Sequence, residues 1–184
     1  RMASGTTGPG WGVVGPAFEA YAGSVTAATH FLRCSKSPDD MHVHLRTMFN
    51  LKIIIASTRP GRKGPAIAQW VTETAQADPR FSVEVLDLAT INLPLMDEPN
   101  HPRLQQYQHQ HTKDWSATIA AADAFIFVMP EYNFGYTAPI KNALDYLFNE
   151  WAHKPVGLVS YGGIGAGMRA VQLLKPVLVA LRLT

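Results

Sequence analysis

The stretch from Leu51 to Gly64 constrains the fold more than any other part of the chain. It begins with an apolar run, Leu51 to Ala56, that only Lys52 interrupts. Three consecutive isoleucines favour a strand, because β-branched side chains are stiff and suit a pleated surface. An apolar run with so little alternation predicts a strand covered on both faces, as in the parallel sheet of an α/β fold.

The residues after this run have the chemistry of a phosphate-binding loop. Ser57 and Thr58 bring hydroxyl groups, and Arg59 and Arg62 bring guanidinium groups that suit phosphate. Pro65 suits the first turn of a helix, where free N–H groups and the helix dipole favour an anion. The loop matches neither the Walker pattern nor the glycine-rich dinucleotide pattern, which favours a phosphate monoester as ligand. The alternative is an ordinary basic turn exposed to solvent.

A second apolar strand and polar loop follow at residues 124–137. The strand, 124–130, is almost wholly apolar, and the loop reads Pro-Glu-Tyr-Asn-Phe-Gly-Tyr-Thr from residue 130. Open α/β sheets bind ligands where their parallel strands end, and aromatic rings with an amide can hold a flat heterocycle there. Core packing of the aromatic rings is the alternative. Thr137 can cap the helix expected over Pro139 to Trp151.

A third unit consists of a strand over Pro155 to Ser160 and a glycine-rich loop over Tyr161 to Gly167. The glycines let the backbone approach a ligand closely. The helix expected from Met168 to Leu183 should kink or break near Pro176. Three loops at one edge, one suited to phosphate and two to a flat polar ring, fit flavin mononucleotide (FMN) better than a simple phosphorylated metabolite.

The remaining elements carry less chemistry. Residues 81–88 alternate between apolar and polar and predict a half-buried strand near a sheet edge. Residues 104–122 predict a helix, on which His109 and His111 would point to different faces. They could not hold a metal together in that geometry, and we predict no metal site.

Composition sets the broad class. A chain of 184 residues that is 47% hydrophobic has room for one domain with a substantial core. The charge of +2 does not point to a nucleic-acid partner, and no apolar run reaches the roughly 18 residues of a membrane span. With Cys34 as the only cysteine, a reducing and hence cytoplasmic location is expected. We expect residues 1–47, interrupted by glycine and proline, to be a poorly ordered N-terminal extension of a domain over 48–184.

From about Phe49 to Thr184 the sequence resembles the NADPH-dependent FMN reductases, which have a flavodoxin-like fold and include quinone and azo-compound reductases. The matching segments are Ser57-Thr58-Arg59 with Arg62, Pro130-Glu131-Tyr132-Asn133, residues 138–145 and Ser160-Tyr161-Gly162-Gly163. The resemblance implies a three-layer sandwich with a parallel sheet of order 2-1-3-4. It also implies FMN and NADPH or NADH as cofactors, and no catalytic side chain, because the flavin N5 takes the hydride.

The resemblance also implies roles for individual residues. The FMN phosphate would be held by Ser57, Arg59 and Arg62. The isoalloxazine would be lined by Pro130, Glu131, Tyr132 and Asn133, and its pyrimidine side would contact Tyr161, Gly162 and Gly163. Glu131 would have a structural role rather than act as a general acid.

The implied activity is that of an FMN-dependent NAD(P)H oxidoreductase that reduces quinones, azo compounds or flavin. The partner would be a small-molecule electron acceptor, and the protein would form a homodimer or homotetramer with the helix over 138–147 near the subunit contact. Two features depart from the family: Ala56 stands where glycine is common, and the sequence ends before the usual fifth strand and closing helix. A flavin-binding module without activity is therefore the alternative. A flavodoxin-type electron carrier is disfavoured by Arg59 and Arg62.

Overall fold

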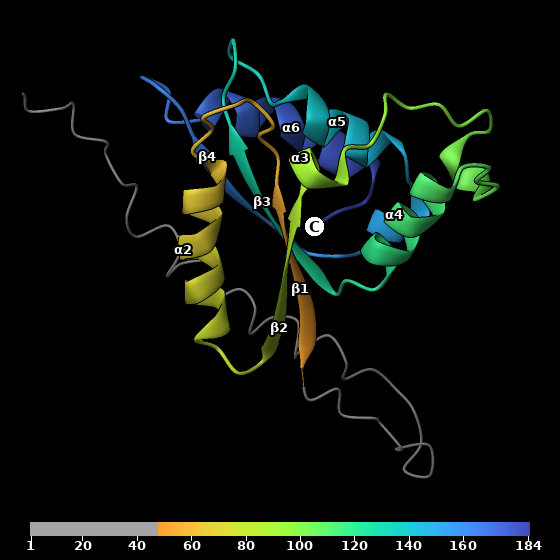
Figure 1. Ribbon diagram of the computed structural model, residues 1–184, viewed down its shortest axis with the longest axis horizontal. Helices are drawn as coiled ribbons and strands as arrows, with labels where there is room; N and C mark the ends of the chain where they lie inside the picture. Colours follow the sequence, from red (N-terminus) through yellow and green to blue (C-terminus); the bar gives the residue numbers. More distant parts are fainter. Residues whose placement is uncertain (1–47) are drawn as a thin grey trace, which may run out of the picture. The chain divides into compact units, whose positions relative to one another are not determined.

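The structure is a computed structural model that describes residues 48–184, and its centre is a parallel sheet with strand order β2-β1-β3-β4. The strands are β1 (Phe49–Ile55), β2 (Phe81–Asp87), β3 (Ala124–Pro130) and β4 (Val156–Tyr161). Helices cover both faces of the sheet, which confirms the predicted three-layer α/β architecture and the predicted strand order (Figure 1). The extension expected over residues 1–47 lies outside the described residues.

Burial along the strands follows their position in the sheet. In β1 the residues from Leu51 onward are all buried, because strands flank it on both sides and helices cover both faces. The one charged side chain in this run, Lys52, pairs with Glu84, its neighbour in register on β2. The edge strand β2 is mostly half-buried or exposed, as its alternating sequence predicts.

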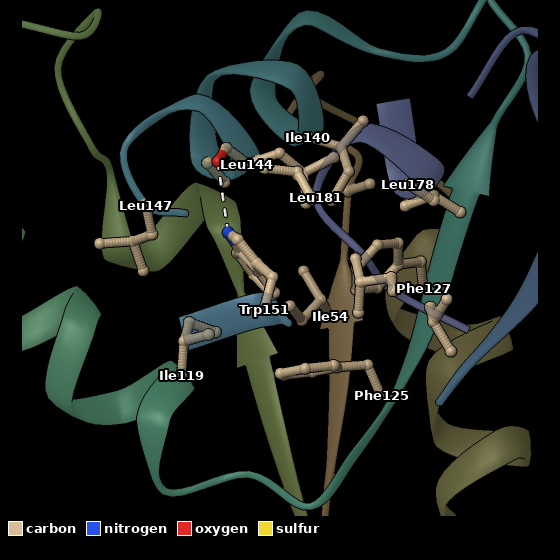
Figure 2. Close-up of a cluster of buried hydrophobic side chains, with 14 of the residues drawn as sticks. Ile54, Ile119, Phe125, Phe127, Ile140, Leu144, Leu147, Trp151, Leu178 and Leu181 are labelled. Carbon is tan, nitrogen blue, oxygen red and sulfur yellow. Dashed lines mark hydrogen bonds between the residues drawn. The ribbon is translucent and has the colours of Figure 1, made fainter. Parts of the chain in front are cut away.

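One face of the sheet carries the larger core. The helices α4 (Gln110–Ala120), α5 (Ala138–Asp145) and α6 (Met168–Ala180) pack there. Figure 2 shows Trp151 at the centre of this cluster, beside Phe125 and Phe127 of β3. Its indole N–H donates a hydrogen bond to the carbonyl of Leu144 over 3.2 Å, so the buried polar atom is satisfied.

The opposite face is covered by α2 (Gly64–Gln76), which packs Ala68 and Val71 on Ile53 and Ile55 of β1. Because α2 begins at Gly64, where the loop after β1 ends, its N-terminus lies at the carboxyl edge of the sheet. The short helix α3 (Leu88–Ile91) directly continues from β2.

The helix predicted over 104–122 is shorter in the structure. A 3-10 turn, η2 (Pro102–Leu104), is followed by irregular chain, and α4 starts at Gln110 with His109 at its N-cap. The expectation that His109 and His111 point to different faces is therefore wrong. Since His109 lies outside the helix, the two rings stack 5.2 Å apart and nearly parallel.

The last two predicted helices also differ in extent. The segment expected as one helix over 139–151 consists of α5 and a separate 3-10 turn, η3 (Asn149–Trp151). In α6 the helix continues past Pro176 to Ala180. At the end of the sequence, the Thr184 carbonyl accepts a hydrogen bond from the N–H of Val156 over 2.8 Å, so the final residue pairs with the start of β4.

None of the described helices is long and apolar enough to cross a membrane.

Candidate functional site

The loops after β1, β3 and β4 meet at the carboxyl edge of the sheet. Hydrogen bonds join them: the Thr137 hydroxyl donates to the Ala56 carbonyl over 2.7 Å, and the Glu131 N–H donates to the Tyr161 carbonyl over 2.8 Å. Thr137 stands at the N-cap of α5, but its hydroxyl links two loops instead of capping the helix as predicted. Ala56 is fully buried in the core, which shows that the fold accommodates the methyl group at this position.

Two buried hydroxyl groups lie at the N-terminus of α2. The Ser57 Oγ and the Tyr161 phenol oxygen are both buried and make no hydrogen bond within 3.5 Å in the described structure. Both surround Gly64: a Cβ at this glycine would overlap Ser57 Oγ and lie 3.0 Å from the Tyr161 oxygen. Buried hydroxyl groups without partners are rare and costly, so these two are candidates to bind a polar ligand.

The first turn of α2 adds N–H donors to these hydroxyls. Lys63, at the N-cap, makes no side-chain cap, and the first turn contains no acidic residue. The N–H groups of a helix N-terminus without a side-chain acceptor favour a bound anion. Burial raises the pKa of the Tyr161 phenol, which keeps it a neutral O–H donor. Hydroxyl and N–H donors thus converge on one place, as a phosphate requires.

The two arginines of this loop have different surroundings. Arg62 forms a two-pronged ion pair with Asp87 at the end of β2, with N–O distances of 2.7 and 2.6 Å, and also donates to the Ser57 carbonyl over 2.6 Å. Its guanidinium therefore fastens the loop to the sheet. Arg59 is exposed and has no side-chain partner in the described part of the chain, so its guanidinium is available to a ligand.

The loop after β3 ends in a tight hairpin. Tyr132 and Gly135 exchange backbone hydrogen bonds of 3.0 and 2.9 Å, and Asn133 and Phe134 between them have φ angles of 49° and 66°. Positive φ at both central residues is typical of a two-residue hairpin turn, although it is uncommon for phenylalanine. Phe134 is 62% exposed, which places an aromatic ring on the surface beside the site.

An ion pair fixes this hairpin to α6. The Glu131 carboxylate, whose side chain is only 9% exposed, accepts hydrogen bonds from the Arg169 guanidinium over 2.9 Å and from the Arg169 N–H over 3.1 Å. The same guanidinium lies 4.0 Å from the centre of the Phe134 ring. Arg169 therefore contacts the hairpin at both its base and its tip. The pairing of the buried Glu131 carboxylate with Arg169 was not visible in the sequence.

The glycine-rich loop after β4 packs against Glu131 and Ser160. At Gly162 a Cβ would lie 3.2 Å from the Glu131 Cβ, and at Gly165 a Cβ would lie 3.2 Å from the Glu131 carboxylate. Gly167 has a φ of 84°, and a Cβ there would lie 2.6 Å from Ser160 Cβ. Gly163 has open space around it. Gly167 is thus required by its conformation and its packing, Gly162 and Gly165 are tightly packed, and Gly163 has room for a side chain.

The predicted site residues therefore fall into separate groups. Ser57 and Tyr161 meet at the start of α2, whereas Pro130, Glu131 and Gly162 lie together at the junction of β3 and β4. Three further residues that the sequence analysis did not single out hold these groups in place: Gly64, Asp87 and Arg169. An arginine in the first turn of a helix opposes the helix dipole, and this signal could have suggested an acidic partner for Arg169.

In the described region, no group of histidine, cysteine, aspartate and glutamate side chains is arranged to hold a metal ion.

Comparison with known proteins identifies the family. The family model for NADPH-dependent FMN reductase matches residues 49–184. A protein named NAD(P)H-dependent FMN reductase in Schizosaccharomyces pombe is 46% identical over 123 residues, which cover 66% of this chain and 62% of that protein. One with the same name in Saccharomyces cerevisiae is 37% identical over 142 residues, covering 71% of this chain and 74% of that protein. The chain thus spans less than two thirds of the fission yeast relative.

A solved structure supports the fold assignment. The flavoenzyme NAD(P)H:(acceptor) oxidoreductase of Paracoccus denitrificans superimposes with a TM-score of 0.61 at 22% identity, over 74% of each chain. At that identity the likeness concerns the fold. The family model and the fungal relatives establish the family: this chain belongs to the NADPH-dependent FMN reductase family.

Proposed function

We propose that the protein is an FMN-dependent NAD(P)H oxidoreductase that passes electrons to a small organic acceptor such as a quinone, an azo compound or free flavin. One observation carries the proposal: the buried hydroxyls of Ser57 and Tyr161, which lack partners, face the uncapped start of α2. This arrangement fits a phosphate monoester, and the adjoining hairpin supplies aromatic and amide groups for a ring. The names of the relatives, which include NADPH:quinone oxidoreductase in Arabidopsis thaliana and NADPH azoreductase in Bacillus, agree with it.

In this proposal the residues at the start of α2 bind the FMN phosphate. Ser57 and Tyr161 donate O–H groups, the first turn of α2 donates N–H groups, and Arg59 adds a charge from the exposed side. Arg62 contributes indirectly, because it holds the loop on Asp87 and on the Ser57 carbonyl. Bound FMN would supply hydride transfer between the nicotinamide and the acceptor.

The second and third loops bind and orient the ring. Pro130, Tyr132 and Asn133 line it from the hairpin side, and Gly162 and Gly163 let the backbone approach its polar rim. Glu131 is a positioning residue in this scheme, because its carboxylate is occupied by Arg169. In this scheme, no side chain of the site transfers a proton during the reaction.

Binding of FMN is the first test. Purified protein is incubated with FMN, desalted and examined by visible absorption, and then NADPH oxidation is followed with a quinone present. Retained flavin bands with turnover support the proposal, and Arg59→Ala should weaken retention. Arg80→Ala is the matched control, since Arg80 is exposed but paired with Asp78 away from the site. Retained flavin without turnover would favour the alternative of a flavin-binding module, and a colourless protein would contradict both.

The subunit contact also remains a proposal. The apolar stripe of α5 is fully buried in the core of its own chain, so it cannot itself form an exposed contact face. The adjoining loop offers a better surface: Asn142 of α5 donates to the Pro94 carbonyl and accepts from the Met96 N–H, while Leu95 between them is 82% exposed. We propose a homodimer or homotetramer with this loop at the contact. A cytoplasmic location stays a prediction from the sequence.

A further inference from the structure

A second place in the molecule gathers positive charge far from the site described above. A hollow of about 460 Å³ is lined by Arg103, Phe148, Asn149, Ala180 and Arg182. The Arg103 guanidinium carbon lies 4.3 Å from the centre of the Phe148 ring, and that of Arg182 lies 5.4 Å from it. Two cations thus share one aromatic ring at the rim of a single hollow.

The hollow lies at the opposite edge of the sheet from the candidate FMN site. The carbonyl of Arg182 accepts a hydrogen bond from the N–H of His153 over 2.8 Å, just before β4 begins at Val156. The FMN site instead lies where β4 ends. The two places are separated by the length of the strand, so the proposed function gives these arginines no role.

These arginines differ from the others that lie over aromatic rings. Arg80 lies over Phe81 and pairs with Asp78, and Arg169 lies over Phe134 and pairs with Glu131. Among the described residues, no carboxylate forms an ion pair with either arginine of the hollow.

Glu150, which follows Asn149 of the hollow in the sequence, does not supply the missing charge. Glu150 is buried, and one of its carboxylate oxygens accepts hydrogen bonds from Tyr107 and Ser116 over 2.8 and 2.7 Å. The one polar contact of the Arg182 guanidinium among the described residues is to the Asn149 side-chain oxygen over 3.4 Å. Both arginines are exposed, so solvent screens part of their mutual repulsion, and an anion between them would replace the remainder with attraction.

We propose that this hollow binds a phosphate group, either inorganic phosphate or the phosphate of a small monoester. A phosphate group carries more than one negative charge at neutral pH, about 1.5 to 2 in a monoester, and offers several acceptor oxygens, which matches two guanidinium forks. A single carboxylate would balance only one of the two charges. The face of Phe148 is already occupied by the arginines, so the ring serves to hold them and not to stack on a ligand.

Arginine-detected NMR tests this proposal on the whole chain loaded with FMN. Inorganic phosphate is titrated against sodium chloride at equal ionic strength, and the Nε–Hε signals of Arg103 and Arg182 are followed. These signals are assigned from their loss in Arg103→Gln and Arg182→Gln. We expect saturable shifts with phosphate, and affinity reduced at least about tenfold in each variant. Shifts that do not saturate, or affinity unchanged in both variants, would overturn the proposal.

Three variants and one further probe sharpen this test. Arg80→Gln is the matched control and should leave phosphate binding unchanged, because Arg80 has its own carboxylate. Lys141→Gln removes a surface charge that pairs with Asp145 outside both sites and should leave these shifts intact. If the double variant Arg103→Gln/Arg182→Gln dissociates an oligomer and the wild-type chain binds no phosphate, the arginines belong to a subunit contact and the proposal fails. Tighter binding of glycerol 3-phosphate than of inorganic phosphate would identify a monoester as the ligand, and the reverse would identify free phosphate.

Discussion

The two ends of the candidate site are built in different ways. At the start of α2, where we place the phosphate, the hydroxyls of Ser57 and Tyr161 are buried and Gly64 leaves no space for even a methyl group. At the hairpin after β3, where we place the ring, Phe134 is largely exposed and the ion pair of Glu131 with Arg169 anchors the turn. The phosphate end is therefore buried and closely packed, whereas the ring end combines a packed base around Glu131 with an exposed tip at Phe134.

This difference has a physical reason. A phosphate has one shape and one charge, so a rigid set of donors can match it completely. The ring end must hold the flavin and also admit a nicotinamide and an acceptor in our proposal. A hairpin that is anchored at its base and exposed at its tip leaves that room. We therefore expect changes at the phosphate end to abolish binding, and changes at the ring end to alter it.

The largest effect is expected from Gly64→Ala. Its new methyl group would overlap Ser57 Oγ, so the loop must move away from α2 and the donors separate. We expect FMN to be lost on desalting and the free energy of unfolding to fall by about 1–3 kcal/mol, as for other overpacked sites. Visible absorption and chemical denaturation measure the two. Gly157→Ala, near the start of β4 and away from the site, is the control, because a Cβ there would make only ordinary contacts, the closest 3.5 Å from Ile126 Cγ1. Equal behaviour of the two variants would refute this account.

A smaller effect is expected from Arg62→Gln. The change removes the ion pair with Asp87 and a bond to the Ser57 carbonyl, while the hydroxyls themselves remain. We expect a loss of about 1–2 kcal/mol of unfolding free energy, with FMN affinity lowered about tenfold through the displaced loop. Arg80→Gln breaks an exposed pair and should cost less than about 1 kcal/mol. An Arg62→Gln variant with unchanged stability but no FMN affinity would mean that Arg62 contacts the phosphate directly.

At the ring end, Glu131→Gln should change how the flavin is oriented without preventing FMN from binding. It breaks the pair with Arg169 but leaves the phosphate donors untouched. We expect FMN retention to change less than about threefold, while the KM for a quinone rises and the flavin absorption bands shift. Lys141→Gln is the control, since it breaks an exposed helix pair with Asp145. Complete loss of FMN in Glu131→Gln would show that the two ends are not independent.

The smallest effect is a pH dependence. The hydrogen bonds from Arg62 lower the pKa of Asp87 in the folded protein. A lowered carboxyl pKa stabilises the fold fully above the unfolded value of about 4, and this contribution is lost as the pH falls through the folded value. Melting temperatures between pH 3 and 6 should therefore fall more steeply on acidification for the wild type than for Asp87→Asn. Parallel curves would show that the pair does not couple to folding.

Much of this protein could be predicted from local sequence, and the failures share a cause. The strands and the start of α2 followed from apolar runs and Pro65, because local spacing sets them. The helix expected over 104–122 was too long because a 3-10 turn and irregular chain precede Gln110. The stacking of His109 on His111 followed from that boundary, which spacing alone did not reveal.

By itself the sequence determined the parallel sheet, the family and the three loops that gather at one edge, since alternation and motif spacing are properties of neighbouring residues. Only the tertiary structure decided which side chains meet. Arg62 pairs with Asp87 across 25 positions, and Glu131 with Arg169 across 38. The two arginines on Phe148 come together only because α6 returns to the amino edge of the sheet. Such contacts depend on how distant segments pack, and no local pattern records that packing.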